Sequence, residues 1–88
     1  METRIAIIGI IVEDTDSTGR VNELLHDCAE FIIGRMGIPY REAGVNIICI
    51  ALDAPENEIN TLAGGIGRIR GVSVKTIYSR IRRRDGTV

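Results

Sequence analysis

Three side chains of this sequence could bind a metal ion or react as nucleophiles: His26, Cys28 and Cys49. His26 and Cys28 are two positions apart in a segment that we expect to be helical, so they project about 200° apart and cannot both ligate one ion. Cys49 falls in an expected strand, and we expect both cysteines to be small buried side chains in a reducing compartment. The sequence therefore predicts no metal site, and His26 is expected to be a solvated helix residue.

Groups for acid–base or nucleophilic catalysis are equally scarce. The single histidine is expected on a polar helix face, the sequence offers no plausible Ser or Cys nucleophile beside a base, and the acidic side chains fall in loops and on helix surfaces. We therefore predict no catalytic residue, no cofactor and no enzyme activity.

The glycines do not form a phosphate-binding loop. Gly64, Gly65 and Gly67 follow an expected helix, whereas a phosphate cradle lies between a strand and a helix N-terminus. Gly34 and Gly37 interrupt an expected strand, where they favour a bulge or the close approach of a partner backbone or a ligand. Both interpretations of this second pair stay open.

Charge is divided unevenly along the chain. Residues 1–67 carry 4 basic and 11 acidic side chains, whereas residues 68–88 carry 7 basic and 1 acidic. Arginine suits carboxylates and phosphates, so the candidate contacts with nucleic acid are Arg80, Arg82, Arg83 and Arg84. A solvated tail, or pairing with the acidic helix faces of another subunit, is favoured over DNA binding, because the sequence contains no helix-turn-helix or ribbon-helix-helix signal. RNA recognition by base stacking is not expected, because the predicted central strands carry no aromatic side chains.

Two strands are expected to position the candidate functional side chains, over residues 4–12 and 45–52. Both strands are apolar at odd and even positions alike. Successive strand side chains point to opposite faces, so both faces of these strands should be buried. Two helices can cover only one face of a small antiparallel sheet, and a second copy of the chain is expected to close the other. The sequence therefore predicts a homo-oligomer, a dimer or a tetramer, associated through a sheet face or edge.

The expected order of elements is strand, helix, strand, strand, helix, strand. Two apolar stripes with helical spacing follow the two strands described above: Val21, Leu24, Leu25, Cys28, Ala29 and Ile32 in the first helix, and Ile59, Leu62, Ala63 and Ile66 in the second. The pattern predicts an α+β, ferredoxin-like βαββαβ fold, with a four-stranded antiparallel sheet and two helices on one face.

Local signals refine this arrangement. Residues 32–40 are expected to form an edge strand, because Pro39 and two glycines interrupt them, and the last strand is expected over residues 72–80. Asp16 or Ser17 is expected to cap the first helix, and Asp53 has capping-box spacing before the second.

Length and composition are those of one small globular domain, expected over residues 1–80 and followed by a basic tail over 81–88. The hydrophobic fraction of 44% and the charged fraction of 26% exclude the disordered and membrane classes. The apolar run at the N-terminus is short and meets Glu13 and Asp14, so it is not expected to be a signal peptide. We therefore expect a cytoplasmic location and no membrane partner.

Three segments carry a resemblance to a known family: IAIIGIIVED near the N-terminus, the run IIGRMGIPYREAGVNIICIALDAP from Ile32 to Pro55, and RGVSVKTIYS further on. Together they resemble small ACT-like proteins proposed as regulators of the iron-only hydrogenase system. The resemblance implies an ACT-like fold and a regulatory role. Such domains are similar to amino-acid-sensing modules and to the metal-sensing half of the nickel-responsive regulator, which associate through their sheets or sheet edges.

The same resemblance implies ligand sites between subunits, where the loop after the first strand meets a neighbour. The family's D-x-P-G motif keeps its Asp and Gly here but lacks the Pro, and the acidic side chains around this loop oppose an anionic ligand, so a plain capping loop is favoured. The nickel-responsive relative uses strand histidines, which are absent from the second strand here, so metal sensing is not carried over. The candidate ligand-binding residues are Asp16, Ser17, Gly19, Gly34, Arg35 and Met36.

The function expected from the sequence is a non-catalytic, ligand-responsive regulatory domain, proposed as a transcriptional regulator, that acts as a homo-oligomer. Its effector would be a small molecule such as an amino acid. The alternatives are an oligomeric protein that associates with DNA through its basic C-terminus, and an adaptor whose sheet binds a protein partner.

Overall fold

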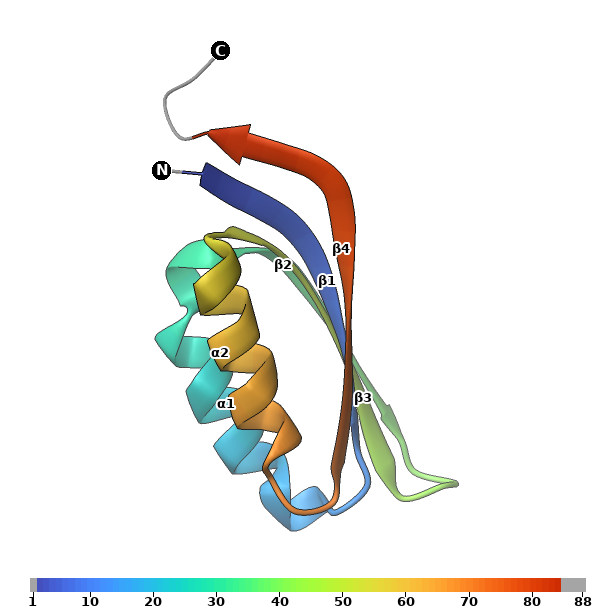
Figure 1. Ribbon diagram of the computed structural model, residues 1–88. Coiled ribbons are helices and arrows are strands. Elements are labelled where there is room, and N and C mark those ends of the chain that lie inside the picture. Colours follow the sequence, from blue (N-terminus) through green and yellow to red (C-terminus); the bar gives the residue numbers. More distant parts are fainter. Residues whose placement is uncertain (1, 85–88) are drawn as a thin grey trace.

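The computed structural model describes residues 2–84, except the side chains of Arg82 and Arg84, and has the predicted α+β architecture (Figure 1). Its elements are β1 (Glu2–Val12), the 3₁₀ helix η1 (Thr15–Ser17), α1 (Thr18–Asp27), the 3₁₀ helix η2 (Ala29–Phe31), β2 (Ile32–Tyr40), β3 (Val45–Ala54), α2 (Glu56–Gly67) and β4 (Val72–Arg84). The four strands form one antiparallel sheet in the order β2-β3-β1-β4. Both helices lie on one face of this sheet, as the sequence predicted (Figure 1).

The hydrophobic core lies between the helices and the inner face of the sheet. Alternate residues of the two central strands point into it and are almost fully buried: Ala6, Ile8, Ile10 and Val12 from β1, and Ile48, Ile50, Leu52 and Ala54 from β3. The helices contribute Val21, Leu25, Ile59, Leu62 and Ile66. Burying one such Ile or Leu side chain is worth about 1.5–3 kcal/mol, so this layer supplies most of the stability of a single chain.

The opposite face of the sheet carries apolar side chains that no helix covers. The strand register places these residues side by side, and we call them the open face: Ile7, Ile11, Met36, Ile38, Tyr40, Ile47, Cys49, Ala51 and Ile77. Several of them are strongly exposed, with Ile77 at 68% and Met36 at 54%. The two-faced apolar pattern of β1 and β3 is therefore confirmed, with one face buried by the helices and the other bare in a single chain.

The first helix is shorter than its apolar stripe predicted. α1 ends at Asp27, the residues from Ala29 form η2, and Ile32 begins β2. The stripe continues beyond the helix because Cys28, Phe31 and Ile32 also pack against the core, so burial alone could not mark where helical hydrogen bonding stops.

One predicted helix cap, Ser17, has the predicted position, but none of the predicted cap residues forms a capping hydrogen bond. Ser17 occupies the N-cap position of α1, but its hydroxyl donates to the Arg70 carbonyl oxygen at a distance of 2.7 Å. Asp14 caps η1 instead, accepting from the Asp16 backbone N–H at 3.0 Å. Asp53 lies in β3 and pairs with Arg83, while Pro55 takes the N-cap position of α2 without a side-chain bond. Tertiary partners therefore replace the expected local caps.

Both edge strands are irregular. β2 is an edge strand, as expected, and its register with β3 shifts between Ile32 and Gly34, where the sequence favoured a bulge or a close approach. β4 runs to Arg84, beyond the expected end at Arg80, and its register with β1 shifts between Arg4 and Ala6. There the two strands bend together toward the helix side (Figure 1). Residues 85–88 of the expected tail lie outside the described residues.

Arg4 ties the bent end of the sheet to α2. Its guanidinium donates to the Ser79 carbonyl oxygen at 2.8 Å and to Glu56 Oε1 at 3.1 Å, and it lies 4.4 Å from the centre of the Tyr78 ring. Burial raises the pKa of Tyr78, and Glu56 raises it further against the opposing effect of Arg4. Arg4 and Glu56 are thus occupied in holding the fold.

Candidate functional site

The chemically reactive side chains of the described residues do not gather in one place. Residues 2–84 contain no group of three or more His, Cys, Asp or Glu side chains arranged to hold a metal ion. His26 is exposed on α1, whereas Cys28 is half-buried at the end of that helix. Burial raises the pKa of the Cys28 thiol, and the nearby carboxylates of Glu58, Asp27 and Glu30 raise it further. This thiol therefore stays protonated at neutral pH and is a weak nucleophile.

The predicted ligand residues of the first loop lie where η1 leads into α1. Asp16 and Gly19 are exposed, and Ser17 is held by its bond to the Arg70 carbonyl oxygen. Their neighbour Thr18 accepts a hydrogen bond from the Asn46 side chain at 3.1 Å and lines a hollow beside β2. The loop therefore reaches the edge of this hollow through Thr18.

The predicted ligand residues of β2 point to opposite sides of the sheet. Met36 pairs with Cys49 and belongs to the open face, whereas Arg35 pairs with the buried residue Ile50 and points toward the helices. The Arg35 guanidinium donates a hydrogen bond to Asn22 Oδ1 of α1 at a distance of 2.7 Å. The structure thus separates two neighbouring residues that the sequence placed in a single site.

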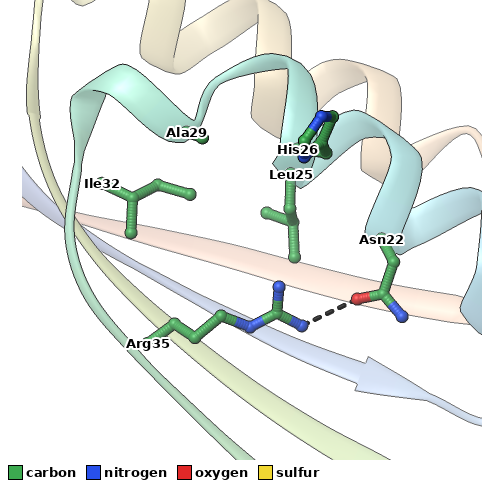
Figure 2. A pocket seen from close by; sticks show the side chains of 6 residues that line it. All are labelled: Asn22, Leu25, His26, Ala29, Ile32 and Arg35. Atoms are coloured by element: carbon green, nitrogen blue, oxygen red, sulfur yellow. Dashed lines mark hydrogen bonds between the residues drawn. The ribbon is translucent and has the colours of Figure 1, made fainter.

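Arg35 and Asn22 stand at the meeting point of two hollows, which together we call the α1–β2 groove. The larger hollow has a volume of about 460 Å³ and is shown in Figure 2, with the lining residues Asn22, Leu25, His26, Ala29, Ile32 and Arg35. The smaller one, of about 270 Å³, continues toward Thr18 along Gly37, whose missing side chain leaves open space. The sequence predicted His26 as a solvated helix residue and did not single out Asn22, although their i, i+4 spacing is a signal that the two share one side of the helix.

A third hollow lies in the middle of the open face. It has a volume of about 370 Å³ and is centred on Gly9, between Cys49 of β3 and Lys75 of β4. A Cβ atom at Gly9 would have only the Lys75 carbonyl oxygen within reach, at 4.0 Å. The absence of one side chain therefore leaves a depression bordered by the side chains of Ile11, Ile47 and Cys49, with Ser73 and Lys75 on its β4 side.

The candidate nucleic-acid residues are only partly described. Arg80 is exposed, and Arg83 forms an ion pair with Asp53. The backbone of Arg82 and Arg84 continues β4, but their side chains lie outside the described part of the chain.

None of the helices within residues 2–84 is long and apolar enough to cross a bilayer.

Comparison with protein families gives one match over most of the chain. Residues 4–76 match the TM1266-like family model, whose description reads "Iron-only hydrogenase system regulator, putative". No curated protein matches the chain in sequence.

Among solved structures, the chain is similar to protein TM1266 from Thermotoga maritima, with 43% identity over 86% of this chain and 96% of that one, and a TM-score of 0.82. The PII-like nitrogen regulatory protein CPII from Thiomonas intermedia K12 is 16% identical over 96% of this chain and 98% of that one, with a TM-score of 0.58. A formyltetrahydrofolate deformylase from Pseudomonas putida KT2440 is 14% identical over 83% of this chain and 28% of its own length, with a TM-score of 0.61. The last two likenesses concern the fold alone.

Proposed function

The chain belongs to the TM1266-like family, described as regulators of the iron-only hydrogenase system, and from this premise we propose that it is a non-catalytic regulatory domain. It works as a homo-oligomer assembled through the open face, and it responds to a small-molecule effector bound on the helix side of β2.

The observation that carries this proposal is the composition of the open face. Nine apolar side chains from all four strands adjoin one another there. Single-chain proteins rarely leave a contiguous apolar surface of this kind in water, and such patches commonly mark interaction sites. A second copy of the same chain is a matching occupant, because a two-fold axis brings one apolar face onto another.

Polar groups lie at the margins of this face: the Asp53–Arg83 ion pair at one end, the Ser73–Glu13 hydrogen bond at the other, and Lys75 on the edge strand β4. Ser73 and Lys75 lie on β4, at the edge of the sheet, and the long Lys75 stem lets its ammonium group reach water while its carbon atoms cover apolar surface. The hollow over Gly9 offers room for an apolar side chain of the opposing copy.

β2 provides a route by which an effector could act on the assembly. Arg35 points into the α1–β2 groove and the adjacent Met36 points into the open face. β2 is an edge strand with an irregular register at Gly34, so its position is held by one neighbouring strand only. A ligand that moves Arg35 therefore also shifts side chains of the subunit interface. The effector would then bind one arrangement of the assembly more tightly than another, and so favour that arrangement.

Alkylation of Cys49 tests whether the open face is covered. Cys49 lies in the middle of this face, so a second copy should shield it from iodoacetamide. We expect the alkylation rate of Cys49 to be lower by about tenfold or more in the unmodified protein than in the variant Ile7→Lys. Mass spectrometry of the peptides measures both rates.

Cys28 serves as the internal reference, because it lies at the end of α1, on the helix side, and its environment does not depend on the open face. If Cys49 reacted equally fast in both proteins, relative to Cys28, the open face would be accessible to solvent and the proposed assembly would be wrong.

A further inference from the structure

We propose that the larger hollow of the α1–β2 groove binds a small monocarboxylate with a short aliphatic body. Arg35 holds the carboxylate, and Leu25, Ala29 and Ile32 contact the aliphatic part. The identification of this ligand as the effector of the assembly rests on the proposed function, whereas the binding site itself rests on the geometry of the groove.

Arg35 supplies a cation without a carboxylate partner in the described structure. Arg4, Arg20 and Arg83, by contrast, each form an ion pair with a Glu or Asp side chain. Arg35 instead donates one N–H to the neutral amide of Asn22. A guanidinium has five donors in a rigid fork, so most of them remain for an anion.

Asn22 orients this fork toward the hollow. In Figure 2 the Arg35 side chain extends from β2 toward α1, with one terminal nitrogen bonded to Asn22 and another pointing toward Leu25. A carboxylate placed against the fork would accept two parallel hydrogen bonds, which is the strongest common geometry for this pair. The Asn22 amide nitrogen remains as a further donor, and the exposed His26 ring stands at the rim.

The remaining lining determines the rest of the ligand. Leu25 is 1% exposed and forms the apolar base of the hollow, and Ala29 and Ile32 line its other end (Figure 2). An aliphatic group resting there would remove apolar surface from water, at about 25 cal/mol per Å². Inorganic phosphate or sulfate could not use these contacts.

Surrounding charge limits the ligand to a single negative charge. Glu23, Asp27 and Glu30 lie on the exposed side of the same segment, and all three are acidic. These carboxylates lie outside the lining of the hollow, and they favour a monoanion over a nucleotide or another polyanion because each added negative charge on the ligand meets repulsion.

Isothermal titration with isovalerate at constant ionic strength tests the site, with neutral isovaleramide, acetate and sulfate as comparison ligands. We expect saturable binding of isovalerate, weaker binding of acetate and isovaleramide, and none of sulfate. Arg35→Met should weaken isovalerate binding about tenfold or more, because a charge-assisted hydrogen bond is worth about 1.5–3 kcal/mol.

Two further variants make the result specific to the groove. Ala29→Phe keeps Arg35 but fills the hollow from an exposed position, and it should weaken binding to a similar extent. Arg41→Met removes the same charge from the exposed turn between β2 and β3 and should leave the affinity unchanged. Absence of saturable isovalerate binding, or equal affinity in Arg35→Met and the unmodified protein, would overturn the proposal.

Sedimentation of the same samples separates this inference from the proposed function. An oligomer that does not bind isovalerate would overturn the carboxylate site alone. Binding to a monomer that stays monomeric would support the site and overturn its assignment as the effector site.

Discussion

Replacement of Ile7 by lysine should convert the assembly into folded monomers. Ile7 lies in the middle of the open face, where it pairs with Ala51 of β3 and Ile77 of β4. A lysine there would have to place its charge in an apolar interface, at a cost of several kcal/mol. We expect the dissociation constant to rise about 100-fold or more, as measured by sedimentation velocity over a range of concentrations.

The variant should remain folded because Ile7 is 44% exposed in a single chain, so the lysine stem can lie along the sheet with its ammonium group in water. Asn57→Lys is the matched control, since it adds the same charge at an exposed position of α2 on the helix side. Equal dissociation constants for the two variants would show that the open face is not the interface.

Replacement of Gly71 by alanine only adds a methyl group. Among substitutions of this kind, we expect it to cause the largest loss of stability. Gly71 has φ +72°, and a Cβ atom there would lie 2.5 Å from Asp14 Cβ and 3.1 Å from the Asp14 backbone nitrogen. The Gly71 carbonyl oxygen also accepts from the backbone N–H groups of Glu13 and Asp14, at 2.7 and 3.1 Å. The clash therefore forces apart the contact that joins the end of β1 to the start of β4.

We expect this substitution to lower the free energy of unfolding by about 3 kcal/mol or more, from strain and the lost hydrogen bonds together. Such a loss corresponds to a fall in Tm of roughly 12 °C or more for a domain of this size, measurable by circular dichroism. Gly44→Ala is the matched control, because Gly44 has φ +67° but open space around its missing Cβ. It should cost only the left-handed strain, about 1–2 kcal/mol. Equal losses for the two variants would mean that the close approach to Asp14 has no energetic consequence.

The sequence was sufficient for the fold and for the bare second face of the sheet. Residues of β1 and β3 are apolar at odd and even positions alike, and this shows that both faces are apolar because a side chain's face depends only on the parity of its position. Pro39 and Gly34 marked β2 as an edge strand for an equally local reason, since one lacks a backbone donor and the other weakens regular pairing.

Features that depend on distant partners were not predictable in the same way. Ser17 and Asp53 have the residue types and positions of helix caps, yet each bonds instead to a group far along the chain, Arg70 and Arg83. The α1–β2 groove needs the strand register to turn Arg35 toward Asn22, and nothing local to either residue specifies that pairing. The hollow over Gly9 likewise exists only because Cys49 and Lys75 flank that glycine in neighbouring strands.

Sedimentation equilibrium of the unmodified protein at several concentrations tests the central claim most directly. Each chain has a mass of 9.6 kDa, so an assembly through the open face predicts a mass of twice this value or a larger whole-number multiple. A mass of 9.6 kDa at every concentration would contradict the account, because the open face would then remain exposed to water in a stable single chain.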